Sequence, residues 1–216
     1  YKLNFFMFLA MLVASLLIQA ATNMFNEYYD FKRGLDNENS VGIGGTIVRH
    51  GVAPRTIMKI ALSFYFVAML LGVYICANSS WFLVAIGLVC MLIGYLYTGG
   101  PYPIAYSPFG ELVSGAVMGM GIVLISFFIQ TKTVTLDAVL ISVPSMILVG
   151  AIMLSNNIRD IVGDSEGGRK TLAIIVGRRA AVNILATFFI VSFSWIFVLI
   201  LFNNLTWFAL IVFLCL

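Results

Sequence analysis

The chain has 216 residues, of which 62% are hydrophobic and 10% are charged, and its formal net charge is +3. Together with a mean hydropathy of +1.06, this composition excludes a water-soluble globular domain, because such domains are roughly half apolar and about a quarter charged. It also excludes a nucleic-acid-binding protein, since no run of basic residues is interleaved with aromatic ones. His50 is the only histidine, and it has no partner with which to form a zinc site or a catalytic triad. We therefore expect an all-α, polytopic bundle of transmembrane helices.

Seven apolar segments approach the ~20 residues that a helix needs to cross a bilayer. They are residues 3–22, 57–77, 81–98, 110–130, 137–155, 181–202 and 205–216. The sequence starts without Met and stops inside the last of them. We therefore expect residues 1–216 to form a single transmembrane domain that is incomplete at one or both ends. Gly115 and Gly119, at a spacing typical of close helix contacts, are expected to pack one span against another.

Long and short connectors alternate between these segments. The long ones cover residues 23–56, 97–110 and 156–179, so an alternating topology places all three on the same side of the membrane. Ten of the 12 basic residues belong to that side. Cytoplasmic loops carry an excess of Lys and Arg, so we predict that the long connectors face the cytoplasm.

The first long connector begins with an acidic motif, in which Asn26 and Asp30 are four residues apart and Glu27 lies between them. A spacing of four puts two side chains on one helix face. Carboxylates at the edge of the hydrocarbon layer are costly unless they bind something positive. Arg55 and Lys59, at the start of the next span, could reach the same cavity, whereas we interpret Lys32 and Arg33 as topology determinants.

The second long connector is rich in glycine, proline and tyrosine. Gly99, Gly100 and Pro101 exclude a helix and predict a folded re-entrant or lid loop. Tyr97 belongs to a set of tyrosines that could stabilise a cation through their ring faces; the alternative is an aromatic belt at the membrane interface. Glu111, which opens the next span, is interpreted as an acid favoured at a helix N-terminus.

The third long connector carries the second acidic motif, made of Asn156, Asp160 and Asp164. Two carboxylates one helical turn apart repel each other, which favours a bound cation. Mg²⁺ takes oxygen ligands, keeps waters and commonly joins a few carboxylates to substrate phosphates. The alternative is a solvated, charge-paired loop, which the presence of a similar motif on the same side disfavours.

Polar and basic neighbours extend this motif. Asn157 could add an amide oxygen or a hydrogen bond, and Arg159, Arg169 and Lys170 lie close by in sequence. Basic residues beside an acidic metal site suit a diphosphate, whose charge exceeds what one metal ion cancels.

The motif NEYYDFKRGLD resembles the first acidic motif of the UbiA superfamily of intramembrane aromatic prenyltransferases. Asn26 and Asp30 match, while Glu27 replaces the usual Asp and Gly34 stands where a third Asp would be. The branch that makes menaquinone has Gly at that point and an Asp two residues later, as Asp36 is here.

Three further stretches resemble the same branch, the 1,4-dihydroxy-2-naphthoate polyprenyltransferases. They are YTGGPYP at residues 97–103, NNIRD at 156–160 and GRKTLA at 168–173. The resemblance covers residues 23–179. Because the family has nine spans, it implies that this chain is a fragment beginning at the second span and lacking the end of the bundle.

The resemblance implies that two Mg²⁺ ions bind a polyprenyl diphosphate and that the prenyl group passes to the ring of 1,4-dihydroxy-2-naphthoate. Diphosphate and CO2 would be released and demethylmenaquinol formed, on the cytoplasmic side of a bacterial plasma membrane whose lipid surrounds the prenyl tail. The residues implied as metal ligands are Asp30, Asp160, Asp164, Asn26, Glu27 and Asn156. Those implied in binding or orienting the substrates are Asn26, Asn157, Arg159, Lys170, Arg55, Lys59, Gly100 and, for the acceptor or the allylic cation, Tyr97.

Three alternatives remain open from the sequence. A sister prenyltransferase acting on 4-hydroxybenzoate, homogentisate or haem would share both acidic motifs, and an acceptor screen would decide. A CDP-alcohol phosphotransferase also uses a DxxxD motif, but the Asp-Gly…Ala-Arg element expected before Asp160 is missing. A divalent-cation transporter would need acids near the bilayer midplane, whereas these lie at the ends of spans.

Overall fold

The computed structural model describes residues 3–36, 45–202 and 204–215. Within them the structure is helical and contains no strand, as expected from the sequence. Five helices are long and apolar enough to cross a membrane: α1 (Phe5–Lys32), α3 (Pro54–Asn78), the continuous helix Gly110–Thr131, α7 (Leu136–Arg159) and α10 (Arg178–Leu201). The helix Gly110–Thr131 comprises α5 (Gly110–Ser114), a π-helical segment η2 (Gly115–Gly121) and α6 (Ile122–Thr131).

Shorter elements complete the chain. They are α2 (Thr46–His50), α4 (Phe82–Leu96), η1 (Ile104–Tyr106), α8 (Ile161–Glu166), α9 (Leu172–Val176) and the 3-10 helix η3 (Trp207–Cys215). Of the seven expected spans, five are thus long helices, the third is the 15-residue α4, and the last is η3. An all-helical membrane bundle is therefore confirmed, and the number of spans agrees roughly.

Two helices extend further than the apolar pattern predicts. α1 continues from the expected end at residue 22 to Lys32, and α7 continues to Arg159. No Gly or Pro interrupts α1 until Gly34, whose φ of +78° belongs to the left-handed region that favours glycine. Most of the first acidic motif is consequently helical, and the true connector begins only after it.

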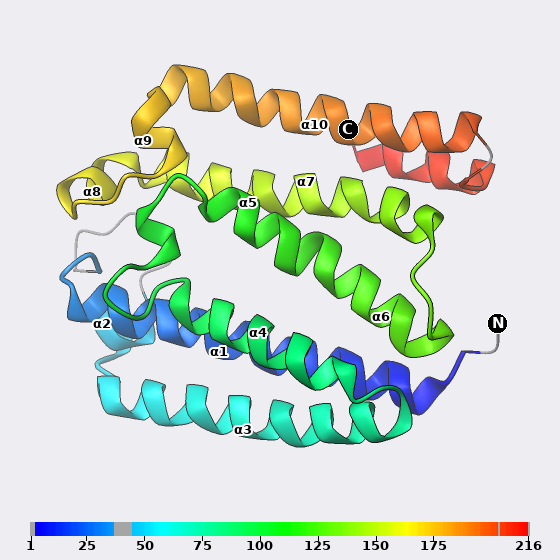
Figure 1. The fold of residues 1–216 in the computed structure, drawn as a ribbon. Helices are drawn as coiled ribbons and strands as arrows, with labels where there is room; N and C mark the ends of the chain where they lie inside the picture. The colour runs from blue at the N-terminus through cyan, green and yellow to red at the C-terminus, as the bar shows by residue number, and fades with distance from the viewer. Residues whose placement is uncertain (1–2, 37–44, 203, 216) are drawn as a thin grey trace.

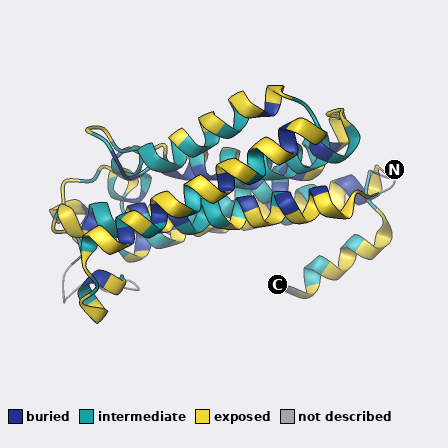
Figure 2. Cartoon of the chain, turned by 90° about the horizontal axis from the view of Figure 1, so that it is seen from below, coloured by how far each residue is buried: buried dark blue, intermediate teal, exposed yellow. Residues whose placement is uncertain are grey.

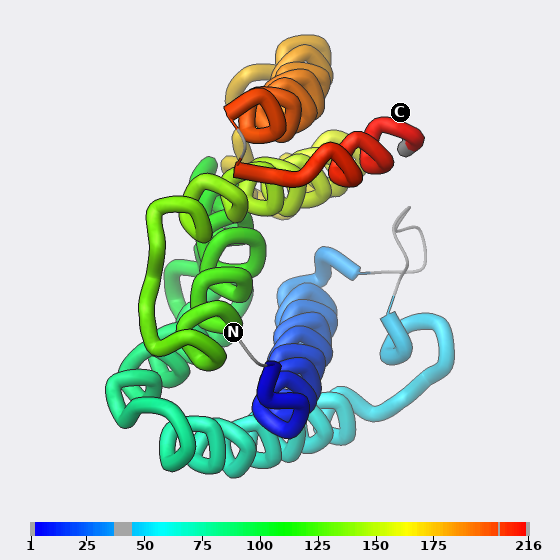
Figure 3. The backbone as a smooth tube through the Cα atoms, turned by 90° about the vertical axis from the view of Figure 1, so that its right-hand side faces the viewer, coloured from blue at the N-terminus to red at the C-terminus, as the bar shows by residue number. Residues whose placement is uncertain are grey.

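The helices run side by side, with the short helical elements of the long connectors gathered at one end (Figure 1). α2, η1, α8 and α9 lie at that end, whereas the tight turns lie at the other. Viewed along the bundle, α3, α4, the helix Gly110–Thr131, α7 and α10 follow one another in an arc, and α1 lies inside it (Figure 3).

Glycines bring the helix Gly110–Thr131 against α7, as predicted for the Gly115/Gly119 pair. A Cβ atom at Gly119 would lie 2.5 Å from the carbonyl oxygen of Ser145, and one at Gly115 would lie 2.3 Å from that of Met146. The two backbones therefore touch here, which fixes the position of α7 and of the polar residues at its end.

Exposed residues cover the outer surface of the bundle (Figure 2), and many of them are large and apolar. Large side chains such as Phe6, Phe66 and Ile190 are between 58% and 71% exposed. An apolar surface of this extent is suited to lipid, because soluble monomers rarely expose large contiguous apolar patches. The chain is an integral membrane protein.

Candidate active site

One cavity of about 450 Å³ runs along the inside of the bundle. The polar side chains towards one end of its lining include Asn23, Asn26, Asp30, Tyr97, Asn156, Asn157, Arg159, Asp160, Asp164 and Arg169. On α1 the lining extends from Asp30 to Met11, a length of roughly 28 Å at the usual helical rise. Beyond the polar end, the walls are mostly aliphatic, from residues such as Ile75, Leu83 and Ile129. The cavity is therefore amphipathic, with a charged head and an apolar body.

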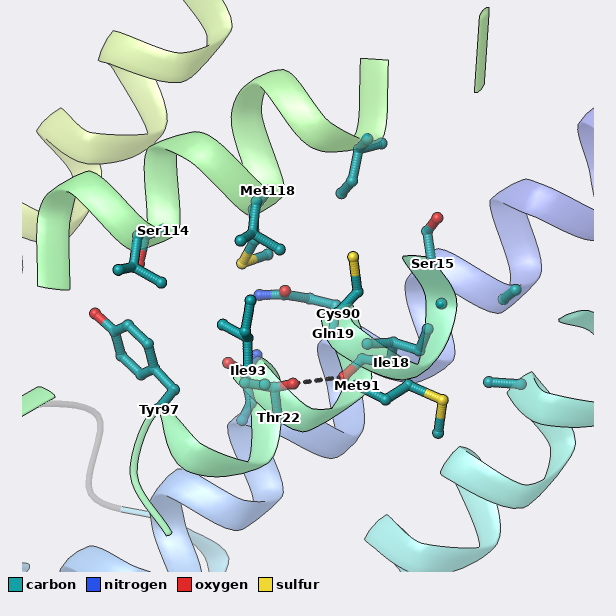
Figure 4. Close-up of a pocket in the computed structure, with 18 of the residues that line it drawn as sticks. Ser15, Ile18, Gln19, Thr22, Cys90, Met91, Ile93, Tyr97, Ser114 and Met118 are labelled. Atoms are coloured by element: carbon teal, nitrogen blue, oxygen red, sulfur yellow. Dashed lines mark hydrogen bonds between the residues drawn. The ribbon is translucent and has the colours of Figure 1, made fainter. Parts of the chain in front are cut away.

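Both polar and apolar side chains line the part of the cavity in Figure 4. There the Tyr97 hydroxyl points towards Ser114, and Gln19 and Thr22 of α1 lie nearby. Thr22 donates its hydroxyl hydrogen to the backbone oxygen of Ile18, one turn earlier, so its polarity is satisfied within the helix. Tyr97 thus presents an aromatic ring between the charged end and the apolar body.

Arg169 joins the two acidic motifs. Its Nη2 donates to Asp30 Oδ1 at 2.5 Å and its Nη1 donates to Asp164 Oδ1 at 2.9 Å. The preceding Gly168 has a φ of +78°, and this turn lets the Arg169 amide donate back to the Asp164 carbonyl oxygen at 2.9 Å. Residues far apart in the chain are consequently held around one guanidinium group.

Asp160 occupies a different environment. It lies at the junction of α7 and α8 and accepts two hydrogen bonds from Arg159, at 2.8 and 2.7 Å. The side chains of this pair are 45% and 32% exposed, so the ion pair adds little stability. Both remain accessible from the cavity that they line.

The acidic end suits a divalent cation. Asp164 Oδ2 is buried and has no hydrogen-bond partner, and burial raises the pKa of this carboxyl group although Arg169 opposes the shift. A cation beside it would offset the cost of burying that charge. Among the described residues, no three Asp, Glu, His or Cys side chains gather at one point. Water and diphosphate oxygens would therefore complete the coordination, as is usual for Mg²⁺.

The structure does not bring every predicted residue to the cavity. Glu27, predicted as a metal ligand, instead accepts a hydrogen bond at 2.7 Å from the Ile47 amide, at the start of α2. Arg55, Lys59 and Lys170 are exposed and do not line the cavity. Their long side chains lie at the surface near helix starts, where water solvates the charge.

Gly100 also lies outside the cavity lining, and its role is in the loop. It has a φ of +76°, and its carbonyl oxygen accepts a hydrogen bond at 2.9 Å from Arg33. Arg33 donates as well to the Thr98 carbonyl oxygen at 2.5 Å, and its guanidinium lies 5.2 Å from the centres of the Tyr29 and Tyr106 rings. Arg33 therefore has a structural role beyond that of a topology determinant, because it ties α1 to the Gly-Gly-Pro loop.

Sequence reasoning also missed Glu111. It is only 4% exposed; its Oε1 accepts a hydrogen bond at 2.9 Å from Asn157 Nδ2, while its Oε2 is buried without a partner. A buried acid on an apolar helix is itself a signal of function. Arg169 was noticed only as one of several nearby cations, because no spacing rule predicts contacts with a motif so distant in sequence.

Comparisons with known proteins agree with this geometry. Residues 2–216 match the UbiA prenyltransferase family. The chain is 64% identical over 195 residues to the 1,4-dihydroxy-2-naphthoate octaprenyltransferase of Bacillus subtilis, covering 90% of this chain and 63% of that protein. It is 31% identical over 184 residues to the UbiA prenyltransferase domain-containing protein 1 of Xenopus tropicalis, covering 82% of this chain and 51% of that protein.

The fold also matches a solved structure. A UbiA homolog from Archaeoglobus fulgidus, bound to GPP and Mg²⁺, superimposes with a TM-score of 0.70 at 16% identity, covering 91% of this chain and 66% of that one. The chain thus spans about two thirds or less of these relatives. On the family match and on the similarity to the Bacillus subtilis protein, the chain belongs to the UbiA prenyltransferase family.

Proposed function

We propose that this chain forms the catalytic part of a prenyltransferase that moves a polyprenyl group from its diphosphate to 1,4-dihydroxy-2-naphthoate, releasing diphosphate and CO2. The observation that carries the proposal is the amphipathic cavity along α1, in which an acidic end continues into an apolar body. A polyprenyl diphosphate has the same division between a highly charged head and a long hydrocarbon tail.

The charged end would hold the diphosphate. Asp30, Asp160 and Asp164 are the carboxylates that would hold Mg²⁺, with Asn26 and Asn156 as neighbouring amide oxygens. When bound, Mg²⁺ would neutralise the charge that develops on the departing diphosphate. Arg159 lines the same end, and its guanidinium group would bind the remaining phosphate oxygens. Arg169 would instead act through the two carboxylates that it contacts.

The apolar walls orient the tail and exclude water. A prenyl chain lying along α1 between the aliphatic side chains would place its reactive carbon near Tyr97, at the boundary between the two parts of the cavity. The Tyr97 ring would stabilise an allylic cation through its face. Exclusion of water prevents the cation from being hydrolysed before the acceptor ring attacks it.

The acceptor and the location are also part of the proposal. The similarity to the Bacillus subtilis naphthoate enzyme supports dihydroxynaphthoate as the acceptor. The Gly-Gly-Pro loop, held to α1 by Arg33, follows Tyr97 of the cavity lining directly. Most basic residues lie at the same end, which supports a site facing the cytoplasm of a bacterial plasma membrane.

A competition assay tests the proposal. The full-length protein in lipid nanodiscs receives Mg²⁺, one long-chain polyprenyl diphosphate and equal amounts of dihydroxynaphthoate, 4-hydroxybenzoate and homogentisate. We expect dihydroxynaphthoate to be prenylated preferentially, and Asp137→Asn, at the opposite end of the bundle, to behave as wild type. Preferential prenylation of 4-hydroxybenzoate would refute the acceptor, and metal transport without diphosphate release would refute the reaction class.

A further inference from the structure

The guanidinium of Arg169 engages one oxygen of each carboxylate. It contacts Asp30 Oδ1 and Asp164 Oδ1, and Asp164 Oδ2 remains buried without a hydrogen-bond partner. Arg169 therefore orients both carboxylates while leaving oxygen atoms for another ligand. Lys could not do this equally well, since its single ammonium lacks the planar fork of arginine.

The three groups are almost removed from water. The exposed fraction of the side chain is 12% for Arg169, 8% for Asp30 and 7% for Asp164. Charges in such an environment interact strongly, because solvent screens them poorly. The formal charges of one guanidinium and two carboxylates add up to −1, so the net charge of this cluster influences which ions it binds.

The position of Arg169 is fixed from several sides. Its guanidinium carbon lies 5.2 Å from the centre of the Tyr106 ring, and the next residue, Lys170, donates its amide hydrogen to the Tyr106 carbonyl oxygen at 3.0 Å. A side chain held this firmly keeps its charge in place when a ligand arrives, which is the condition for preorganised electrostatics.

We propose that Arg169 is a positioning residue that couples binding of the divalent cation to binding of diphosphate. Addition of a divalent cation to a cluster of charge −1 gives a net charge of +1, which attracts the anionic diphosphate. Without Arg169, the two carboxylates and the cation would already sum to zero. Arg169 therefore weakens binding of the cation alone and strengthens binding of the cation together with diphosphate, and this coupling is reciprocal. The inference rests on the proposed function only in taking diphosphate as the natural anion.

Mn²⁺ binding measures the coupling without any prenyl transfer. Free Mn²⁺ is quantified by electron paramagnetic resonance with the full-length protein in nanodiscs, with and without inorganic diphosphate, against protein-free blanks that contain the same Mn²⁺ and diphosphate. In wild type we expect diphosphate to lower the Mn²⁺ dissociation constant at least tenfold. In Arg169→Gln, Mn²⁺ alone should bind at least as tightly as in wild type. Direct bonds between metal and diphosphate remain in this variant, so the effect of diphosphate should persist but be at least threefold smaller than in wild type.

Two further variants sharpen the test. Arg169→Lys keeps the charge but loses the fork, so its coupling should be intermediate; Arg178→Gln, which removes an exposed charge at the start of α10, should behave as wild type. An uncoupled wild type, or wild-type coupling in Arg169→Gln, overturns the proposal. If Arg169→Gln does not fold, wild-type coupling in Arg169→Lys overturns it. A coupled protein that prenylates no acceptor would instead refute the proposed function and leave this inference standing.

Discussion

Gly119→Ala tests how the contact between η2 and α7 positions the site. The added Cβ would lie 2.5 Å from the Ser145 carbonyl oxygen and 2.6 and 2.7 Å from the Met146 Cα and N atoms. Since ordinary contacts are about 3.5–4.0 Å, α7 must move outward by roughly 1 Å. These neighbours are backbone atoms, so no side chain can rotate away to relieve the clash.

Overpacking of this kind costs about 1–3 kcal/mol of unfolding free energy, which corresponds to a fall in Tm of roughly 2–12 °C for a chain of this size. Because α7 ends in the polar residues of the cavity, a displacement of about 1 Å should also lower kcat/KM by up to ~10²-fold. Thermal unfolding in nanodiscs and steady-state kinetics measure the two effects.

The matched control for stability is Gly72→Ala in α3, where an added Cβ has no atom within 4 Å. Because Gly72 lines the cavity, the activity of Gly119→Ala is compared with that of wild type. It should be neutral or more stable by roughly 0.5–1 kcal/mol, since glycine destabilises a helix interior relative to alanine. If Gly119→Ala is as stable as Gly72→Ala and as active as wild type, the inferred role of the contact is wrong.

Three further predictions concern the polar end of the bundle. Glu27→Ala should lower the free energy of unfolding by about 1 kcal/mol, because the α2 cap is lost, and should leave the Mg²⁺ concentration for half-maximal activity unchanged. Glu27→Gln should keep the wild-type stability and Mg²⁺ requirement. A strongly raised Mg²⁺ requirement in these variants would restore Glu27 as a metal ligand. Burial raises the pKa of Asp36 to about 6. This group therefore stabilises the fold below about pH 4, and that stability is lost as pH rises through about 6. Asp36→Asn should remove this part of the pH dependence of Tm, and an unchanged Tm profile would contradict the prediction. Cysteines at Ser107 and Ser165 should react with a membrane-impermeant reagent only after the cells are permeabilised, and labelling from outside would reverse the topology; Ser40, in the same predicted cytoplasmic region, lies outside the described residues.

Much of the fold is predictable from this sequence because lipid imposes a simple rule. Each span must be apolar over its length and satisfy its own backbone hydrogen bonds, so hydropathy alone locates the long helices. The ends of α1 and α7 were placed too early because their polar residues interrupt the apolar pattern without ending the helix. Helices stop at backbone signals such as Gly34, not at the membrane boundary.

The site was predictable only where its residues form local motifs. Asn26, Asp30, Asp160 and Asp164 stand at helical spacings, and the structure brings them to one cavity. The contact of Arg169 with both acidic motifs depends on how α1 and the segment after α8 pack together. Residue spacing in the sequence does not predict that packing.

Arg33, Glu111 and Glu27 also make contacts that the spacing of residues in the sequence does not predict. Arg33 and Glu111 bind partners on other helices or loops, and Glu27 has the sequence context of a ligand but the geometry of a helix cap. Local patterns thus identify which residues are chemically capable, whereas tertiary packing decides which of them meet.

The central claim is that carboxylates from both acidic motifs act through Mg²⁺ on the diphosphate. Its most direct test is single-turnover release of diphosphate from a polyprenyl diphosphate over a Mg²⁺ titration. The proteins compared are wild type, Asp30→Asn, Asp160→Asn and Asp164→Asn. Asp137→Asn is the control for loss of an acid far from the cavity. We predict that each cavity variant that still inserts and folds releases diphosphate at least ~10²-fold more slowly, in keeping with loss of transition-state charge stabilisation, and that EDTA abolishes release in wild type. Full release in EDTA, or near-wild-type release by Asp160→Asn or Asp164→Asn, would contradict the account.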